Sequence, residues 1–351
     1  MIKKIICILF IFLSYTFIAQ IKHWDTTYYK KYKDRIIISY FQSYKNYEID
    51  ISQKLLKDTI GQSKINYMAE ANLISGFEFN YDKINFQIGF KSPTSAINST
   101  QKGKTSYRNL SLNIGGNRWV LENSYRRYNG FYNKNTSTYD TNYKHTGIYT
   151  QLPNLSSESY KTKFLFFTNS NKFSFKSGYS CSYRQLKSAF SFVLVASLNY
   201  NRINSDSSFI PAPVRKYYDS YQSVNGLNTF GVAIYGGGSL NLVIWKALFA
   251  NITIVIGPEW QWRNYNYLSS RQNQQLFYGS ISGDTRFSLG LNFKKFFALV
   301  SGSSDYAYYN GGQMEFLSKY GSINFSLGIR IKTKTPKFYR NFQASDIYRK
   351  L

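Results

Sequence analysis

The sequence predicts an all-β protein, an antiparallel, up-and-down transmembrane β-barrel of about 12 strands within a range of 10–14. Three observations predict this fold: an export signal at the N-terminus, a high content of aromatic residues, and an alternation of apolar and polar residues that recurs along the chain. Each is compatible with other folds when taken alone. Together they predict a barrel in the outer membrane of a Gram-negative cell.

The first 19 residues have the layout of a secretory signal peptide. Lys3 and Lys4 form a basic start, residues 5–13 form an apolar core, and Ala19 supplies a small residue at the expected cleavage position. The apolar core is too short for a membrane helix, which needs about 20 predominantly apolar residues. We therefore expect residues 1–19 to be removed after export.

The composition favours strands, because 33 Tyr, 28 Phe and 5 Trp stand against only 6 Pro. Loss of Lys3 and Lys4 with the signal lowers the formal charge from +26 to +24. A soluble nucleic-acid binder could carry such a charge, but export argues against a nucleic-acid partner. In a barrel, Lys and Arg are expected in the lumen, in the loops and beside anionic head groups.

The alternation is clearest in three segments, residues 84–91, 287–294 and 323–332. In the last, Ile323, Phe325 and Leu327 fall on one face, and Asn324 and Ser326 on the other. A strand between lipid and a polar lumen has this pattern over roughly 10 residues. Further strands are expected to begin near Arg35, Asn66, Tyr107, Arg118, Tyr160, Lys172, Phe190, Thr229, Leu248 and Phe296.

Between these segments, short turns are expected at 81–83, 115–117, 169–171 and 294–295, and longer loops at 92–104, 133–158, 204–226, 264–282 and 303–320. The expected organisation is a signal peptide at 1–19, an N-terminal periplasmic segment at 20–34, the barrel at 35–333 and a C-terminal periplasmic tail at 334–351. Aromatic clusters, which include Tyr125, Tyr128, Phe131, Trp262 and Tyr265, are expected to form the interfacial girdle.

Several local patterns resemble DUF4421, a family of outer-membrane proteins of unknown function in Bacteroidota. They include 102–104 leading into Asn109, the aromatic run 125–132, residues 183–189, and 206–211. The resemblance extends from about residue 30 to about residue 332. It implies a barrel and a location, and it names no catalytic residue.

The sequence points to no enzyme and no cofactor. His145, in an expected loop, is the only histidine that could serve a catalytic site there, and no serine nucleophile motif or adjacent carboxylate accompanies it. Metal ligands at suitable spacing are also lacking. The main hypothesis is a non-enzymatic pore, binding or envelope-structural protein. The alternatives are a lipid-modifying enzyme that uses His145 and an accessory subunit of a secretion or adhesion complex.

Polar residues of the alternating strands are expected to line the lumen, and the candidates are Lys91, Asn292, Lys294, Arg330 and Lys332. Expected partners are outer-membrane lipid, lipopolysaccharide and the barrel-assembly machinery. The tail beyond Thr333, with Lys334, Lys337, Arg340 and Arg349, is the segment through which an accessory role would act.

Overall fold

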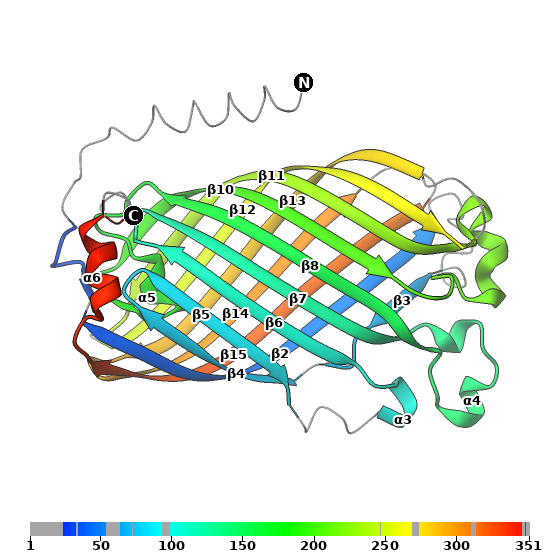
Figure 1. The fold of residues 1–351 in the computed structure, drawn as a ribbon, viewed down its shortest axis with the longest axis horizontal. Coiled ribbons are helices and arrows are strands. Elements are labelled where there is room, and N and C mark those ends of the chain that lie inside the picture. The colour runs from blue at the N-terminus through cyan, green and yellow to red at the C-terminus, as the bar shows by residue number, and fades with distance from the viewer. Residues whose placement is uncertain are drawn as a thin grey trace.

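The computed structural model describes residues 24–32, 34–53, 64–71, 73–92, 99–245, 247–268, 274–309, 314–345 and 348. They form a closed antiparallel barrel of 12 strands, as the sequence predicts (Figure 1). Closure is made by β15 (Met314–Lys332), which pairs with β2 (Arg35–Gln53) from Met314↔Gln53 to Lys332↔Arg35. The expected signal peptide lies outside the described residues.

The other strands of the barrel follow one another as hairpins. They are β4 (Leu73–Tyr81), β5 (Ile84–Lys91), β6 (Ser106–Gly115), β7 (Trp119–Asn133), β8 (Gln151–Phe167), β10 (Ala189–Asn204), β11 (Val224–Val243), β12 (Leu248–Tyr267), β13 (Gln274–Asn292) and β14 (Phe296–Tyr309). Among the described residues, no helix is long and apolar enough to cross a membrane.

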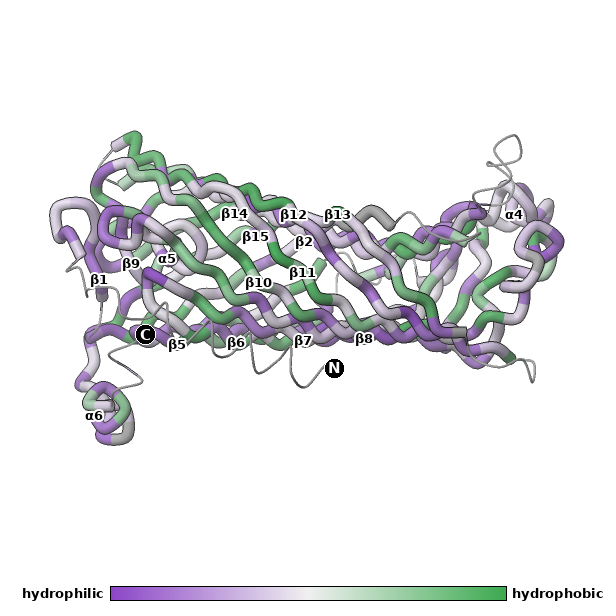
Figure 2. Tube along the Cα trace, turned by 90° about the horizontal axis from the view of Figure 1, so that it is seen from above, coloured by the Kyte–Doolittle hydropathy of each residue, from purple (hydrophilic) through white to green (hydrophobic). Residues whose placement is uncertain are grey.

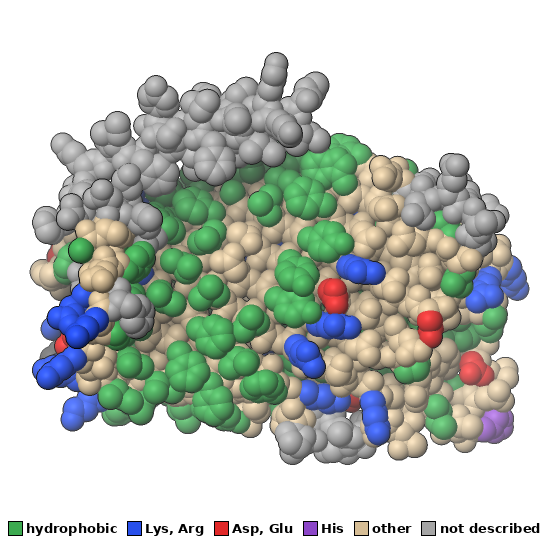
Figure 3. Space-filling view, in the orientation of Figure 1, with side chains coloured by type: hydrophobic (Ala, Val, Ile, Leu, Met, Phe, Trp, Pro, Cys, Tyr) green, Lys and Arg blue, Asp and Glu red, His purple; other side chains and the backbone are tan. Residues whose placement is uncertain are grey.

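The alternation in the sequence becomes an apolar exterior and a polar interior. On β15, Ile323, Phe325 and Leu327 are about half exposed, whereas Ser326 and Arg330 are buried. Figure 3 shows a broad surface of hydrophobic side chains over one part of the barrel wall, and Figure 2 shows hydrophobic stretches along β10 and β11 away from the hydrophilic loops. An exposed apolar surface of this extent is expected to face lipid.

The two ends of the barrel differ, and we name them for their contents. The terminal end holds the start of β2, the end of β15, the short turns and α6 (Lys337–Ala344). The loop end holds the longer connections, including α3 (Ser99–Lys102), η3 (Thr136–Thr138), α4 (Tyr143–Thr146), η4 (Ala212–Tyr217) and η5 (Asp219–Tyr221).

The wall is narrower at the loop end. There β3 (Ile65–Met68) pairs with β2 on one side and with Tyr132 and Asn133 of β7 on the other. Closer to the terminal end, β4, β5 and β6 stand between β2 and β7 instead. One strand replaces three, so the circumference loses two strands along the barrel axis.

Three expectations about the strands are corrected. The segment expected to begin a strand near Lys172 is not part of the wall; it contains α5 (Phe175–Tyr179) and β9 (Tyr183–Gln185). β8 begins at Gln151, nine residues before the expected start. The loops expected at 264–282 and 303–320 are largely strand, because β12, β13, β14 and β15 extend farther toward the loop end than expected.

The segments flanking the barrel pack against its terminal end. In the N-terminal segment, β1 (Tyr29–Lys31) pairs with β9 in register Tyr29↔Gln185. In the tail, the buried Tyr339 of α6 donates a 3.2 Å hydrogen bond to Asp82 in the turn between β4 and β5. Its ring contacts that of Tyr81, with centroids 4.8 Å apart. Both flanking segments are therefore parts of the folded structure.

Candidate functional site: a polar chamber

The interior of the barrel contains two adjoining cavities of about 270 and 120 Å³, which we call the polar chamber. Arg126, Lys161, Asp305 and Tyr320 line both. They come from β7, β8, β14 and β15, whose inward positions the alternation supplies. The chamber therefore lies across the lumen and is lined by both sides of the barrel wall.

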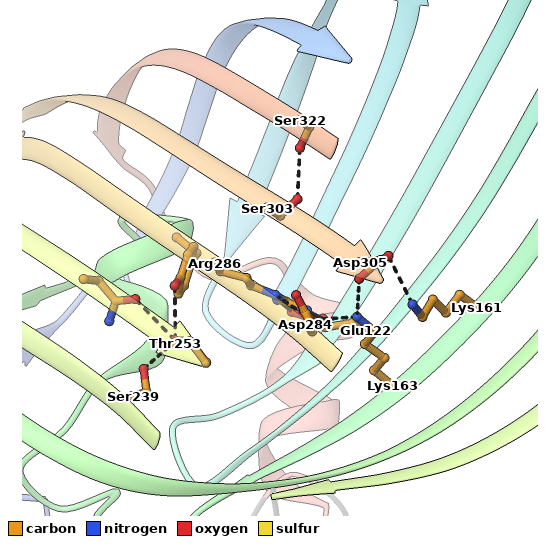
Figure 4. A network of polar contacts seen from close by, with 12 residues as sticks. Glu122, Lys161, Lys163, Ser239, Thr253, Asp284, Arg286, Ser303, Asp305 and Ser322 are labelled. Carbon is orange, nitrogen blue, oxygen red and sulfur yellow. Dashed lines mark hydrogen bonds and ion pairs between the residues drawn. The ribbon is translucent and has the colours of Figure 1, made fainter. Parts of the chain in front are cut away.

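A chain of ion pairs crosses one part of the chamber (Figure 4). Arg286 donates from Nη1 and Nη2 to the two carboxylate oxygens of Glu122 at 2.7 and 2.8 Å. The same guanidinium meets Asp284 at 2.7 Å, and Lys163 meets Asp284 at 2.6 Å. Because Lys163 and Asp284 are almost fully buried, removing one partner would leave a buried charge, at a cost of about 3–5 kcal/mol.

The chain continues to Asp305, which is shared among three cations. Lys161 and Lys163 lie 3.1 Å from its carboxylate oxygens, and Arg126 lies 3.6 Å away. The Arg126 guanidinium also sits 3.9 Å from the centroid of the Tyr320 ring. One carboxylate thus neutralises only part of the positive charge that surrounds it.

Positive charge is in excess in the chamber as a whole. Among the described residues that line the larger cavity, the cations are Lys45, Arg126, Lys161, Lys163, Lys176 and Arg286, and the anions are Glu78, Glu122, Asp284 and Asp305. Lys45 donates to the hydroxyl of Tyr107 at 2.8 Å. A chamber with this charge favours anions over cations.

Residues 168–188, which we call the plug, pack inside the barrel at the terminal end of the chamber. Barrel side chains donate to its backbone: Asn241 to Ser174 O at 2.8 Å, and Ser288 to Gly178 O at 2.6 Å. Arg330 donates from Nε to Cys181 O at 3.2 Å. Bonds from barrel side chains to main-chain carbonyls fix the path of the plug.

Side chains of the plug in turn contact residues of the barrel. Phe173 and Phe175 are buried in a cluster with Phe167 of β8, and Tyr179 donates to Thr253 at 3.1 Å. Lys176 donates to Asp82 O at 3.0 Å, and desolvation by burial lowers the pKa of Lys176 to about 7. The plug is therefore both packed and hydrogen-bonded.

At the loop end, residues 205–223, which we call the cap, pack against wall residues of the barrel. Its buried Phe209, Ile210, Val214 and Tyr218 join an apolar cluster with barrel residues. The barrel members of this cluster include Ile49, Ile51, Tyr67, Leu152, Leu155, Tyr265 and Phe316. Tyr67 donates to Phe209 O at 2.5 Å, and Tyr218 donates to Ile51 O at 3.1 Å.

The five residues expected in the lumen have different positions. Arg330 and Asn292 are buried inside the barrel and bond to the plug, Asn292 through Tyr183 O at 3.2 Å. Lys91 is partly buried near the loop end and donates to Thr105 O at 3.0 Å. Lys294 lies in the turn between β13 and β14, and Lys332 is the last residue of β15. Both are therefore exposed at the rim of the terminal end rather than in the lumen.

Sequence reasoning did not select the residues of the ion-pair chain. Glu122 belongs to this chain, Glu78 and Glu259 line the cavities, and Glu70 pairs with Lys102 at 3.3 Å. Lys161 and Lys163 alternate with outward-facing residues of β8, and this alternation is the signal that would have placed them inside.

His145 lies on α4 at the loop end and is exposed. In the described part of the chain, no serine or carboxylate is hydrogen-bonded to its imidazole, and no group of three His, Cys, Asp or Glu could hold a metal ion. The geometry around His145 therefore offers no support for a catalytic site.

Several solved outer-membrane structures are similar to this chain over most of its length. The outer membrane protease OmpT of Escherichia coli has 7% identity and a TM-score of 0.38, covering 85% of this chain and 97% of its own. The attachment invasion locus protein Ail of Yersinia pestis has 8% identity and a TM-score of 0.26, covering 86% and 100%. Values this low carry no information on activity.

No curated protein matches the chain. The model of the family described as "Domain of unknown function (DUF4421)" matches residues 23–330. This match spans the N-terminal segment, the polar chamber, the plug and the cap. The chain therefore belongs to the DUF4421 family.

Proposed function

We propose that the protein is a non-enzymatic barrel of the outer membrane, closed to solutes at rest, that serves the envelope through binding or structure. The observation that carries this proposal is the packing of the plug and of the cap against the barrel wall at the two ends of the chamber. An open pore needs a continuous aqueous path, and in this proposal these two segments interrupt it.

The proposed orientation in the outer membrane follows from the lengths of the connections between strands. Outer-membrane barrels have short turns in the periplasm and longer loops outside the cell. The terminal end, with its short turns, would then face the periplasm, and the loop end would face outward. Outer-membrane lipid and the barrel-assembly machinery are the partners that this placement implies.

A second candidate is a gated passage for small anions. The excess of Lys and Arg around Asp305 favours it, because cationic lumens select anions. In this version, the plug would leave its site when the passage opens. The closed state would be the same in both proposals, so the difference between them lies in whether the natural protein ever opens.

The test is conductance of the purified, refolded protein in a planar bilayer, beside a variant in which residues 174–184 of the plug and 206–220 of the cap are each replaced by a Gly/Ser linker of equal length. The proposal expects the natural protein to be silent at all voltages and the linker variant to conduct with a preference for anions. Steady conductance of the natural protein would overturn it.

Voltage-dependent openings of the natural protein would support the gated passage instead. In the linker variant, Arg126→Gln with Lys161→Gln should then weaken anion preference, and Lys134→Gln with Lys144→Gln serves as the matched control at exposed loop positions. Heat-modifiable migration of each variant checks that its barrel is folded.

A further inference from the structure

On the exterior of the barrel, toward the loop end of the apolar surface, side chains of neighbouring strands form three successive rows. The first is an aromatic row in unbroken register: Tyr125↔Tyr160, Tyr160↔Tyr200, Tyr200↔Phe230, Phe230↔Trp262 and Trp262↔Phe277. Four of these five pairs are in ring contact, with centroids from 4.7 Å apart for Tyr125 and Tyr160 to 6.5 Å for Tyr160 and Tyr200. Such rings prefer the level where acyl chains meet head groups.

The next outward-facing residues toward the loop end are charged on four adjacent strands. Arg108 pairs with Arg127, Arg127 with Glu158, and Glu158 with Arg202. We call Arg108, Arg127 and Arg202 the arginine row. With strands about 4.8 Å apart, the row extends over roughly 14 Å. Figure 3 shows a group of basic side chains over this part of the wall, at the edge of the hydrophobic surface.

The arginine row keeps a net positive charge. Glu158 lies 3.3 Å from Arg127, whereas Arg108 and Arg202 have no carboxylate partner among the residues that the structure describes. All three arginines are exposed. On the next two strands, β11 and β12, the positions in register are the uncharged Asn228 and Asn264, so the arginine row ends at β10 on this side.

A third row follows one step farther from the membrane. Ser106 pairs with Asn129, Asn129 with Ser156, and Ser156 with Asn204. These side chains are partly or fully exposed hydroxyls and amides without charge. From the membrane outward, these four strands thus present an apolar level, aromatic on β7, β8 and β10 and Leu110 on β6, then the arginine row with Glu158 on β8, and then neutral hydrogen-bonding groups.

We propose that this face of β6, β7, β8 and β10 binds a phosphorylated glycolipid of the outer leaflet. Acyl chains would lie against the aromatic row, phosphates would meet the arginine row, and sugar hydroxyls would meet the row of Ser and Asn. Arginine suits the phosphate level, because its planar fork bonds phosphate oxygens in pairs. The proposal rests on the outer-membrane placement proposed above and is independent of whether the lumen opens.

The three-layer match favours a glycolipid over a phospholipid. A phospholipid head group brings one phosphate, whereas three arginines spread over four strands suit a wide head group with several polar groups. The row of Ser106, Asn129, Ser156 and Asn204 would have no equivalent partner in a simple phospholipid.

The test is native mass spectrometry of the folded, full-length barrel in detergent, titrated with lipid A that carries two phosphates, with dephosphorylated lipid A, and with phosphatidylglycerol. The variant replaces Arg108, Arg127 and Arg202 by Gln. The matched control replaces Lys134, Lys144 and Lys216 by Gln, which removes the same charge from exposed loop positions.

We expect the arginine variant to bind lipid A at least about tenfold more weakly, and the control to bind within about twofold of the natural protein. Dephosphorylated lipid A should bind the natural protein as weakly as lipid A binds the variant. Equal binding of both forms of lipid A, equal binding of phosphatidylglycerol, or an equal loss in the control would overturn the proposal. The lipid comparison on the natural protein stands even if the variant fails to fold, and none of these outcomes bears on conductance.

Discussion

The plug and the cap close opposite ends of one lumen with different interactions. At the plug, Asn241, Ser288, Asn292 and Arg330 of the wall donate hydrogen bonds to main-chain carbonyls. At the cap, apolar side chains around Phe209 fill the mouth, and two tyrosine hydroxyls supply the bonds to main-chain carbonyls.

This difference determines how precisely the position of each segment is defined. Hydrogen bonds to carbonyls are directional, so they define one position of the plug, and each buried carbonyl left without a donor costs about 1–3 kcal/mol. Apolar contacts are non-directional, so the cap can repack or lift as a unit. We therefore expect the two closures to open independently.

The largest effect is expected from Phe209→Ala in the cap. Truncation of a buried Phe costs about 3–5 kcal/mol, which is about a hundredfold or more in the population of the open cap. Limited trypsin digestion measures it, because Arg215 and Lys216 lie exposed in the cap. Cleavage there should accelerate while the plug remains protected; equal acceleration in the plug would show that the two closures are coupled.

A somewhat smaller effect is expected from Arg330→Met, a change in the wall that removes hydrogen bonds to the plug. The change removes donors to Cys181 O and to Asn292 Oδ1, hydrogen bonds of a charged group that are worth about 1.5–3 kcal/mol. Hydrogen exchange of the amides of 174–185 should become roughly 10- to 100-fold faster, without a change in cap cleavage. Unchanged exchange in the plug would mean that its packing alone holds it, and Arg330→Lys should recover part of the protection.

The smallest effect is expected from Asn241→Ala, which removes neutral donors to Ser174 O and Gln185 Oε1. The cost is about 1 kcal/mol, or about a fivefold change in the same exchange rates. The corresponding change for the cap is Tyr67→Phe in β3, which removes one hydroxyl donor to Phe209 O. If Asn241→Ala opened the plug as far as Arg330→Met does, the charge of Arg330 would not matter.

The wall of the barrel could be predicted from the sequence because lipid and lumen impose a strict period of two. The segments at 84–91, 287–294 and 323–332 are strands in the predicted places. The same period also divides the expected aromatic girdle: Tyr125 and Trp262 face outward, whereas Tyr128, Phe131 and Tyr265 are buried inside.

The plug and the ion-pair chain could not be predicted in the same way. The plug has polar and aromatic residues like a strand, and only its contacts with Arg330, Asn241 and Ser288 identify it as an inserted segment. The chain from Glu122 to Asp305 joins residues far apart in sequence, so it depends on strand register across the lumen. Local sequence patterns do not predict such long-range pairs.

The pairing of β2 with β15 has a consequence for assembly. The first and last strands of the barrel are neighbours, so the ring cannot close until the last strand has arrived. Until then, two long strand edges stay unpaired, and unpaired edges invite association with other chains. Contacts between such distant parts of a chain also form slowly. The N-terminal β1, bound to β9 of the plug, holds the start of the chain near the closing seam, which shortens the search that the last strand must make.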